Sequence, residues 1–247
     1  MNKIANVTII FWIMKICATT LGETAGDLLS MTMNIGYAVS SAILISLFLI
    51  SVIAQLKATR FHPILYWTVI LMTSTAGTTI SDFMDRTLGL GYEKGSLILI
   101  VCLLVVLLAW RISEKSLSVS NIQTTRAELF YWTAILFSNT LGTALGDFLA
   151  DNSGLGFLGG ATLVAGLLGL IVIATIFTRI NRVLLFWIAF VLTRPFGATF
   201  GDLLTKPITK GGLNFGTAGS SLVLASLLAA FVIYTSVQET RALSQEV

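Results

Sequence analysis

Residues 131–149 read YWTAILFSNTLGTALGDFL, and three other stretches of the chain follow the same pattern. These stretches are FWIMKICATTLGETAGDLL from Phe11, YWTVILMTSTAGTTISDFM from Tyr66 and FWIAFVLTRPFGATFGDLL from Phe186. In each copy a Trp precedes a Gly by ten residues, and that Gly precedes an Asp by five. The copies hold Trp12, Gly22 and Asp27; Trp67, Gly77 and Asp82; Trp132, Gly142 and Asp147; and Trp187, Gly197 and Asp202. The chain is therefore built from four tandem repeats.

The composition is that of a membrane protein. Of the 247 residues, 55% are hydrophobic and 11% are charged, whereas a soluble domain carries about 25% charged residues. Runs such as 96–110 are uniformly apolar, which predicts membrane-spanning helices and disfavours a β-barrel. The net charge of +3 comes without a basic tract, so no nucleic-acid partner is expected. Cys17 and Cys102 lie inside apolar runs, which argues against a disulfide or thiolate metal site, and no cofactor is expected.

Each repeat contains two apolar stretches of helical length. The predicted helices cover about 5–28, 37–56, 64–84, 95–112, 129–150, 157–178, 183–204 and 216–237. The fold class is therefore an all-α membrane protein with eight transmembrane helices. Because each repeat crosses the membrane twice, the four repeats are parallel and pseudo-symmetric about the membrane normal. We expect a single membrane domain over 1–247, with repeats at about 1–57, 58–115, 122–180 and 181–247 and two halves joined by a linker over 111–128.

Basic residues predict the orientation. The side with the termini and the inter-repeat linkers carries nine Lys and Arg residues, and the side with the hairpin turns carries four. The positive-inside rule then places both termini in the cytoplasm. The four repeated Trp residues are expected in an interfacial aromatic belt on that side.

The repeated Asp residues are the main functional signal, because a carboxylate inside the hydrocarbon costs several kcal/mol. Polar residues three or four positions apart share a helix face with each Asp. The predicted polar stripes are Thr20, Glu23 and Asp27; Thr75, Thr78 and Asp82; Thr140, Thr143 and Asp147; and Pro195, Ala198 and Asp202. Copies two and three keep both hydroxyls, so Asp82 and Asp147 are predicted as the core of a cation or metal site.

Buried charges point to a cationic ligand. Five acids, Glu23 and the four repeated Asp, stand against Lys15 and Arg194, which leaves a formal charge of minus three. Such a surplus requires protonation, a wet cavity or a bound cation. Carboxylate and hydroxyl oxygens suit hard cations, and an organic cation or a proton fits the charge equally well.

Structural interpretations remain open for the same residues. The Asp side chains can cap the turns that follow them, and Lys15, Glu23 and Arg194 can form a balancing ion pair between copies one and four. Asp85 and Asp151 are expected to face water.

The spaced Trp, Gly and Asp copies resemble a family of bacterial membrane proteins of unknown function, built from four tandem repeats. Each repeat in that family has two membrane helices and a characteristic Trp. The resemblance covers nearly the whole chain. It implies a multi-pass inner-membrane protein of eight helices and brings no established activity.

We expect a secondary transporter or exporter of a cation, either a divalent metal such as manganese or an organic cation, coupled to an ion gradient through the aspartates. The partners are the lipid bilayer and a small cation or proton, and a homo-oligomer is compatible with the sequence. A cation channel and a purely structural role are the alternatives. An enzyme is not expected, because Ala144 stands where the Gly-x-Gly-Asp pattern of intramembrane aspartyl proteases needs Gly.

Overall fold

The computed structural model describes residues 3–119, 122 and 124–245. Within this part of the chain the fold has eight α-helices and no strand, which confirms the all-α prediction. The helices are α1 (Ile9–Asp27), α2 (Tyr37–Lys57), α3 (Pro63–Asp82), α4 (Gly91–Glu114), α5 (Thr125–Asp147), α6 (Gly156–Phe177), α7 (Arg182–Thr205) and α8 (Thr217–Gln245). Short π-helical segments continue three of them: η1 (Leu28–Thr32), η2 (Phe83–Thr87) and η4 (Phe148–Asn152). A 3-10 turn, η5 (Ile208–Lys210), follows α7.

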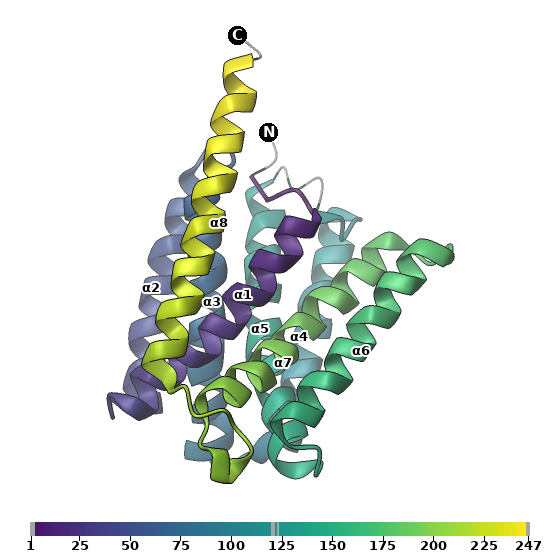
Figure 1. The fold of residues 1–247 in the computed structure, drawn as a ribbon. Helices are drawn as coiled ribbons and strands as arrows, with labels where there is room; N and C mark the ends of the chain where they lie inside the picture. Colours follow the sequence, from purple (N-terminus) through teal and green to yellow (C-terminus); the bar gives the residue numbers. More distant parts are fainter. Residues whose placement is uncertain (1–2, 120–121, 123, 246–247) are drawn as a thin grey trace.

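The first helices of the four repeats form a closed inner ring. Helix α1 packs against α3, α3 against α5, α5 against α7, and α7 against α1. Each second helix then covers the inner helix of the following repeat: α2 packs on α3, α4 on α5, α6 on α7 and α8 on α1. The last repeat therefore closes onto the first. Both termini lie at one end of the ring, and the hairpin turns lie at the other (Figure 1).

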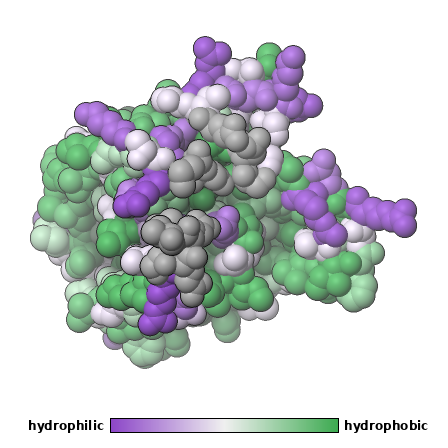
Figure 2. Space-filling view, turned by 90° about the horizontal axis from the view of Figure 1, so that it is seen from above, coloured by the Kyte–Doolittle hydropathy of each residue, from purple (hydrophilic) through white to green (hydrophobic). Residues whose placement is uncertain are grey.

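The outer surface suits an apolar environment. Five helices in the described part of the chain are long and apolar enough to cross a membrane, namely α2, α4, α6, α7 and α8. The other three, α1, α3 and α5, are inner helices, and most of their polar side chains are buried. Hydrophilic side chains project around the end that holds the termini, above largely hydrophobic flanks (Figure 2).

The repeated Gly residues lie where neighbouring inner helices cross. A β-carbon at Gly22 would overlap Ser74 of α3, and one at Gly142 would overlap Arg194 of α7. Gly77 and Gly197 meet α5 and α1 in the same way. The four glycines therefore allow the close backbone approach that holds the ring together, as small residues do in membrane helix packing.

The repeated Trp residues also join the repeats. An aromatic ring at the start of each inner helix contacts the Trp of the next repeat, at centroid distances of 5.6–6.5 Å. The pairs are Phe11 with Trp67, Tyr66 with Trp132, Tyr131 with Trp187, and Phe186 with Trp12. Trp67, Trp132 and Trp187 are buried by these contacts. The prediction of an interfacial belt is therefore wrong for these three residues, because the ring buries them.

Several helix ends differ from the prediction. Helix α5 begins at Thr125, where the Thr124 hydroxyl accepts a hydrogen bond from the Ala127 amide. Helix α8 continues to Gln245, through polar turns beyond the predicted end at about residue 237. The interval predicted as a linker, 111–128, includes the last turn of α4 and the first turn of α5. Its positions 120, 121 and 123 lie outside the described residues. Helices α3 and α5, on either side of it, pack directly together.

Candidate functional site

Residues spaced by four positions along each inner helix form successive layers across the ring. Positions four apart lie on one helix face, so the repeats bring equivalent residues to the same level. From the turn end, the layers are Asp27, Asp82, Asp147 and Asp202; Glu23, Thr78, Thr143 and Ala198; Thr19, Ser74, Asn139 and Arg194; Lys15, Ile70, Ile135 and Phe190; and Phe11, Tyr66, Tyr131 and Phe186. All of these residues are buried except Phe186, which is partly buried.

Two basic residues bridge the four Asp side chains in pairs. Arg86 lies 3.1 Å from Asp82 through Nε and 2.9 Å from Asp147 through Nη2. Lys206 lies 2.6 Å from Asp27 and 3.1 Å from Asp202. The Arg86 bridge therefore joins α3 to α5, and the Lys206 bridge joins α7 to α1.

Both bridging residues stand four positions after an Asp. The segment η2 keeps the helix of copy two going beyond Asp82, so Arg86 stays on the face that carries this Asp. Lys206 directly follows the end of α7. Burial alone would lower the pKa of Lys206, but Asp202 and Asp27 raise it above the ordinary value, so Lys206 remains charged.

An ion pair joins the next two layers, which contain Glu23 and Arg194. Arg194 Nη1 lies 3.0 Å from Glu23 Oε2, and neither side chain is more than 3% exposed. Arg194 also donates to the Thr78 and Thr143 hydroxyls and to two carbonyl oxygens, those of Thr19 and Ser74. One guanidinium on α7 thus contacts all three other inner helices.

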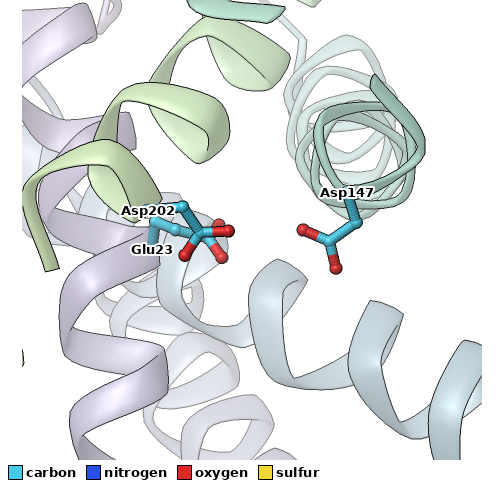
Figure 3. A group of neighbouring side chains, drawn as sticks. All are labelled: Glu23, Asp147 and Asp202. Atoms are coloured by element: carbon cyan, nitrogen blue, oxygen red, sulfur yellow. The ribbon is translucent and has the colours of Figure 1, made fainter. Parts of the chain in front are cut away.

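Three carboxylates from the Asp layer and the neighbouring Glu23 layer approach one another closely. Oxygen atoms of Glu23, Asp147 and Asp202 lie within 4.8 Å of one another, from α1, α5 and α7 (Figure 3). Such a group of oxygen atoms can hold a cation. Asp82, one of the two residues predicted as the metal core, lies outside this group of three and is bridged to Asp147 by Arg86.

The charge balance differs from the prediction because of the bridging residues. Arg86 and Lys206 are two of the four basic residues counted on the side with the hairpin turns, and they bring two positive charges to the ring. Five acids then stand against four bases, which are these two residues and the buried Lys15 and Arg194. If all nine are ionised, one negative charge is left uncompensated, whereas the sequence predicted three.

Other predicted residues lie outside the cluster. The Thr75 and Thr140 hydroxyls donate to carbonyl oxygens one turn earlier in their own helices, those of Leu71 and Leu136. Thr78 and Thr143 do reach Glu23, each at 3.4 Å.

Lys15 lies two layers below Glu23 on α1. Its Nζ is 3.3 Å from Asn139 Oδ1 and 4.1 Å from the centre of the Phe190 ring. Asp85 also departs from expectation, because it is buried and accepts a hydrogen bond from the Ser81 hydroxyl, whereas Asp151 is exposed as predicted.

The layers toward the termini are closed by packed side chains. Ile70, Ile135 and Phe190 are completely buried, and the Tyr66 and Tyr131 hydroxyls share a hydrogen bond of 2.6 Å. The carboxylate layer therefore lies near the turn end of a ring that is filled at its other end.

Three of the four repeated Asp side chains are not used as caps. Asp27, Asp82 and Asp147 each precede a π-helical segment, and none of them makes a side-chain capping hydrogen bond to it.

A family model described as "Repeat of Unknown Function (DUF347)" matches the chain four times, over residues 10–61, 65–116, 130–181 and 185–241. The chain belongs to this repeat family. Each match spans one inner helix and the outer helix that follows it, so the family unit is the two-helix repeat described above. Searches of curated proteins and of solved structures found no match.

Proposed function

We propose that this DUF347 protein is an integral membrane secondary transporter of a cation, and that the carboxylate layer is its binding site. All eight helices cross the bilayer in this proposal. The outer helices face lipid, and the less apolar inner helices cross inside the ring that they form. Aliphatic side chains exposed along α2, α4, α6 and α8 support this arrangement.

The proposed location is the bacterial inner membrane, with both termini in the cytoplasm. Eight of the nine basic residues assigned to the terminal end are exposed, and the ninth, Lys3, pairs with Glu128. At the turn end Arg86, Lys94 and Lys210 are exposed, and Arg86 and Lys206 bind carboxylates. The count of nine basic residues against four supports this orientation.

The observation that carries the proposal is the convergence of the four buried Asp carboxylates on two tethered cations, Arg86 and Lys206. Buried carboxylates in a membrane protein mark ion pathways, because each one costs free energy that a purely structural residue would save. In the conformation described, Arg86 and Lys206 offset part of the negative charge of the site. A transported cation would take the place of one of them and release its side chain toward the turn end.

The bridges also suggest how the ring opens. They hold α3 to α5 and α7 to α1, while no ion pair of the described residues joins α1 to α3 or α5 to α7 at the Asp layer. The outer helices follow the same division, since α2 and α4 cover the first pair and α6 and α8 the second. In our proposal these two four-helix groups move against each other during transport. The moving groups then differ from the two halves expected from the linker, because α1 joins the last repeats.

Arg194 holds the groups together in the state described. It sits on α7 with its partner Glu23 on α1, and it donates to Thr78 and Thr143 in the other group. The closed layers below it argue against an open channel in this conformation.

Transport by purified protein in liposomes tests the proposal. Uptake of protons, Mn²⁺ and organic cations would be measured for the wild type, for an Asp82→Asn/Asp147→Asn variant and for Glu93→Gln. Glu93 is an exposed acid on α4, so its variant controls for the loss of a negative charge. We expect uptake of at least one cation to fall at least tenfold in the Asp variant only. Equal uptake by all three proteins would contradict the proposal.

A further inference from the structure

Arg86 occupies a cage made of two acids and two aromatic rings. Its guanidinium contacts the carboxylates of Asp82 and Asp147 at 3.1 and 2.9 Å. The ring centres of Tyr37 and Tyr92 both lie 5.9 Å from its central carbon. The Tyr37 hydroxyl also accepts a hydrogen bond of 3.1 Å from Arg86 Nη1.

This combination of partners matches a planar organic cation. Carboxylates bind the N–H edges of a guanidinium, and aromatic rings attract a cation within about 6 Å of their centres. A divalent metal needs several oxygen ligands at short range and gains little from tyrosine rings. At the other bridge the Lys206 ammonium pairs with Asp27 and Asp202, and no aromatic ring of the described residues lies over it. The cage on the Arg86 side is therefore the one with organic-cation chemistry.

The occupant of the cage is tethered, and it is the more accessible partner. The Arg86 side chain is 30% exposed, whereas the side chain of Asp82 is 2% exposed. Asp82 also keeps a buried oxygen, Oδ2, that has no hydrogen-bond partner among the described residues. If Arg86 swings toward water, it leaves a formed site with two carboxylates, of which Asp82 has an oxygen to spare.

We propose that the transported cation is an organic cation of the guanidinium type, which binds between Asp82, Asp147, Tyr37 and Tyr92 in exchange for the Arg86 side chain. This inference rests on the proposed transport function and specifies its substrate class. Arg86 then acts as an internal competitor, which supplies one positive charge to the empty site and is displaced when the substrate arrives.

Binding of guanidinium chloride to the purified full-length protein in detergent tests the competition, with ionic strength held constant by NaCl. Removing the competitor in Arg86→Ala should tighten guanidinium binding at least tenfold relative to the wild type. Arg86→Gln should do the same and serves as a second variant if Arg86→Ala is unstable. Adding Asp82→Asn to either variant should abolish the binding. Guanidinium binding that is no tighter in a folded Arg86 variant than in the wild type would overturn the inference.

Ring substitutions test the aromatic part. Tyr37→Leu/Tyr92→Leu should weaken guanidinium binding at least fivefold, while Tyr37→Phe/Tyr92→Phe should keep most of it, because the ring faces remain. Equal binding by the Leu and Phe variants would overturn the role of the rings.

Uptake into liposomes separates this inference from the general function. Guanidinium uptake that depends on Asp82 supports both. Asp82-dependent uptake of Mn²⁺ without uptake of guanidinium would overturn the substrate class and leave the transport function standing. If no cation is taken up in an Asp82-dependent manner, both proposals fail.

Discussion

The ion pair between Glu23 and Arg194 gives the sharpest stability prediction. Glu23→Gln leaves the Arg194 guanidinium buried without its carboxylate, and breaking a buried pair in this way costs about 3–5 kcal/mol. Arg194 keeps four other acceptors, namely two carbonyl oxygens and the hydroxyls of Thr78 and Thr143. We therefore expect the lower end of that range, about 3 kcal/mol. For a chain of this size, 1 kcal/mol corresponds to about 2–4 °C, so the unfolding temperature should fall by about 6–12 °C.

Thermal unfolding in detergent, followed by intrinsic Trp fluorescence, measures this change. The double variant Glu23→Gln/Arg194→Met removes both charges and should regain most of the loss, ending within about 4 °C of the wild type. Glu93→Gln, at an exposed site, should not shift the transition. A Glu23→Gln protein as stable as the wild type, or a double variant less stable than Glu23→Gln, would refute the assignment of a buried and mutually dependent pair.

Two further predictions test the packing of the ring. Gly142→Ala places a β-carbon against Arg194 and should cost about 2 kcal/mol, an overpacking cost of about 3 less about 1 for helix propensity, whereas Gly169→Ala, at an open position, should be neutral or stabilising. Unfolding temperatures in detergent compare the two, and equal shifts would count against the close crossing. Tyr66→Phe leaves the buried Tyr131 hydroxyl without its partner and should cost about 1–3 kcal/mol, while the double Phe variant should recover part of this. A double variant that loses the sum of both single effects would contradict the shared hydrogen bond.

The sequence predicted much of the fold because the repeat pattern carries it. Four copies of an apolar two-helix unit imply a helical protein, and the Trp-to-Asp spacing implies equivalent positions. It did not predict which copies pack together. The ring order, and the placement of each outer helix on the following repeat, depend on side-chain packing between segments far apart in the sequence, such as Gly197 of α7 against Thr19 of α1.

The candidate site was predicted in part. Burial of the four Asp residues and of Glu23 agrees with expectation, since a repeated acid in an apolar helix must face the interior. Arg86 and Lys206 were missed because they were counted among the turn residues. Their position four residues after an Asp was the signal, because this spacing places both side chains on one helix face when the helix continues.

Ser74 and Asn139 were missed for a related reason. The predicted stripes ended seven residues before each Asp, at positions whose hydroxyls bind their own helix. The position eight residues before each Asp faces the ring instead, and in copy four it holds Arg194. Two steps of four residues back from each Asp reach this layer, whereas the predicted stripes used one step of four and one of three.

Charge movement on cation binding is the measurement that bears most directly on the carboxylate layer. Proteoliposomes adsorbed to a solid-supported membrane would receive a rapid jump in cation concentration, first with guanidinium and then with Mn²⁺. The wild type and Glu93→Gln should give a transient current that saturates with the concentration of a bound cation, and Asp147→Asn should give none, because Asp147 belongs to both the Arg86 bridge and the three-carboxylate group. The same saturating current in Asp147→Asn as in the wild type would contradict cation binding at this layer.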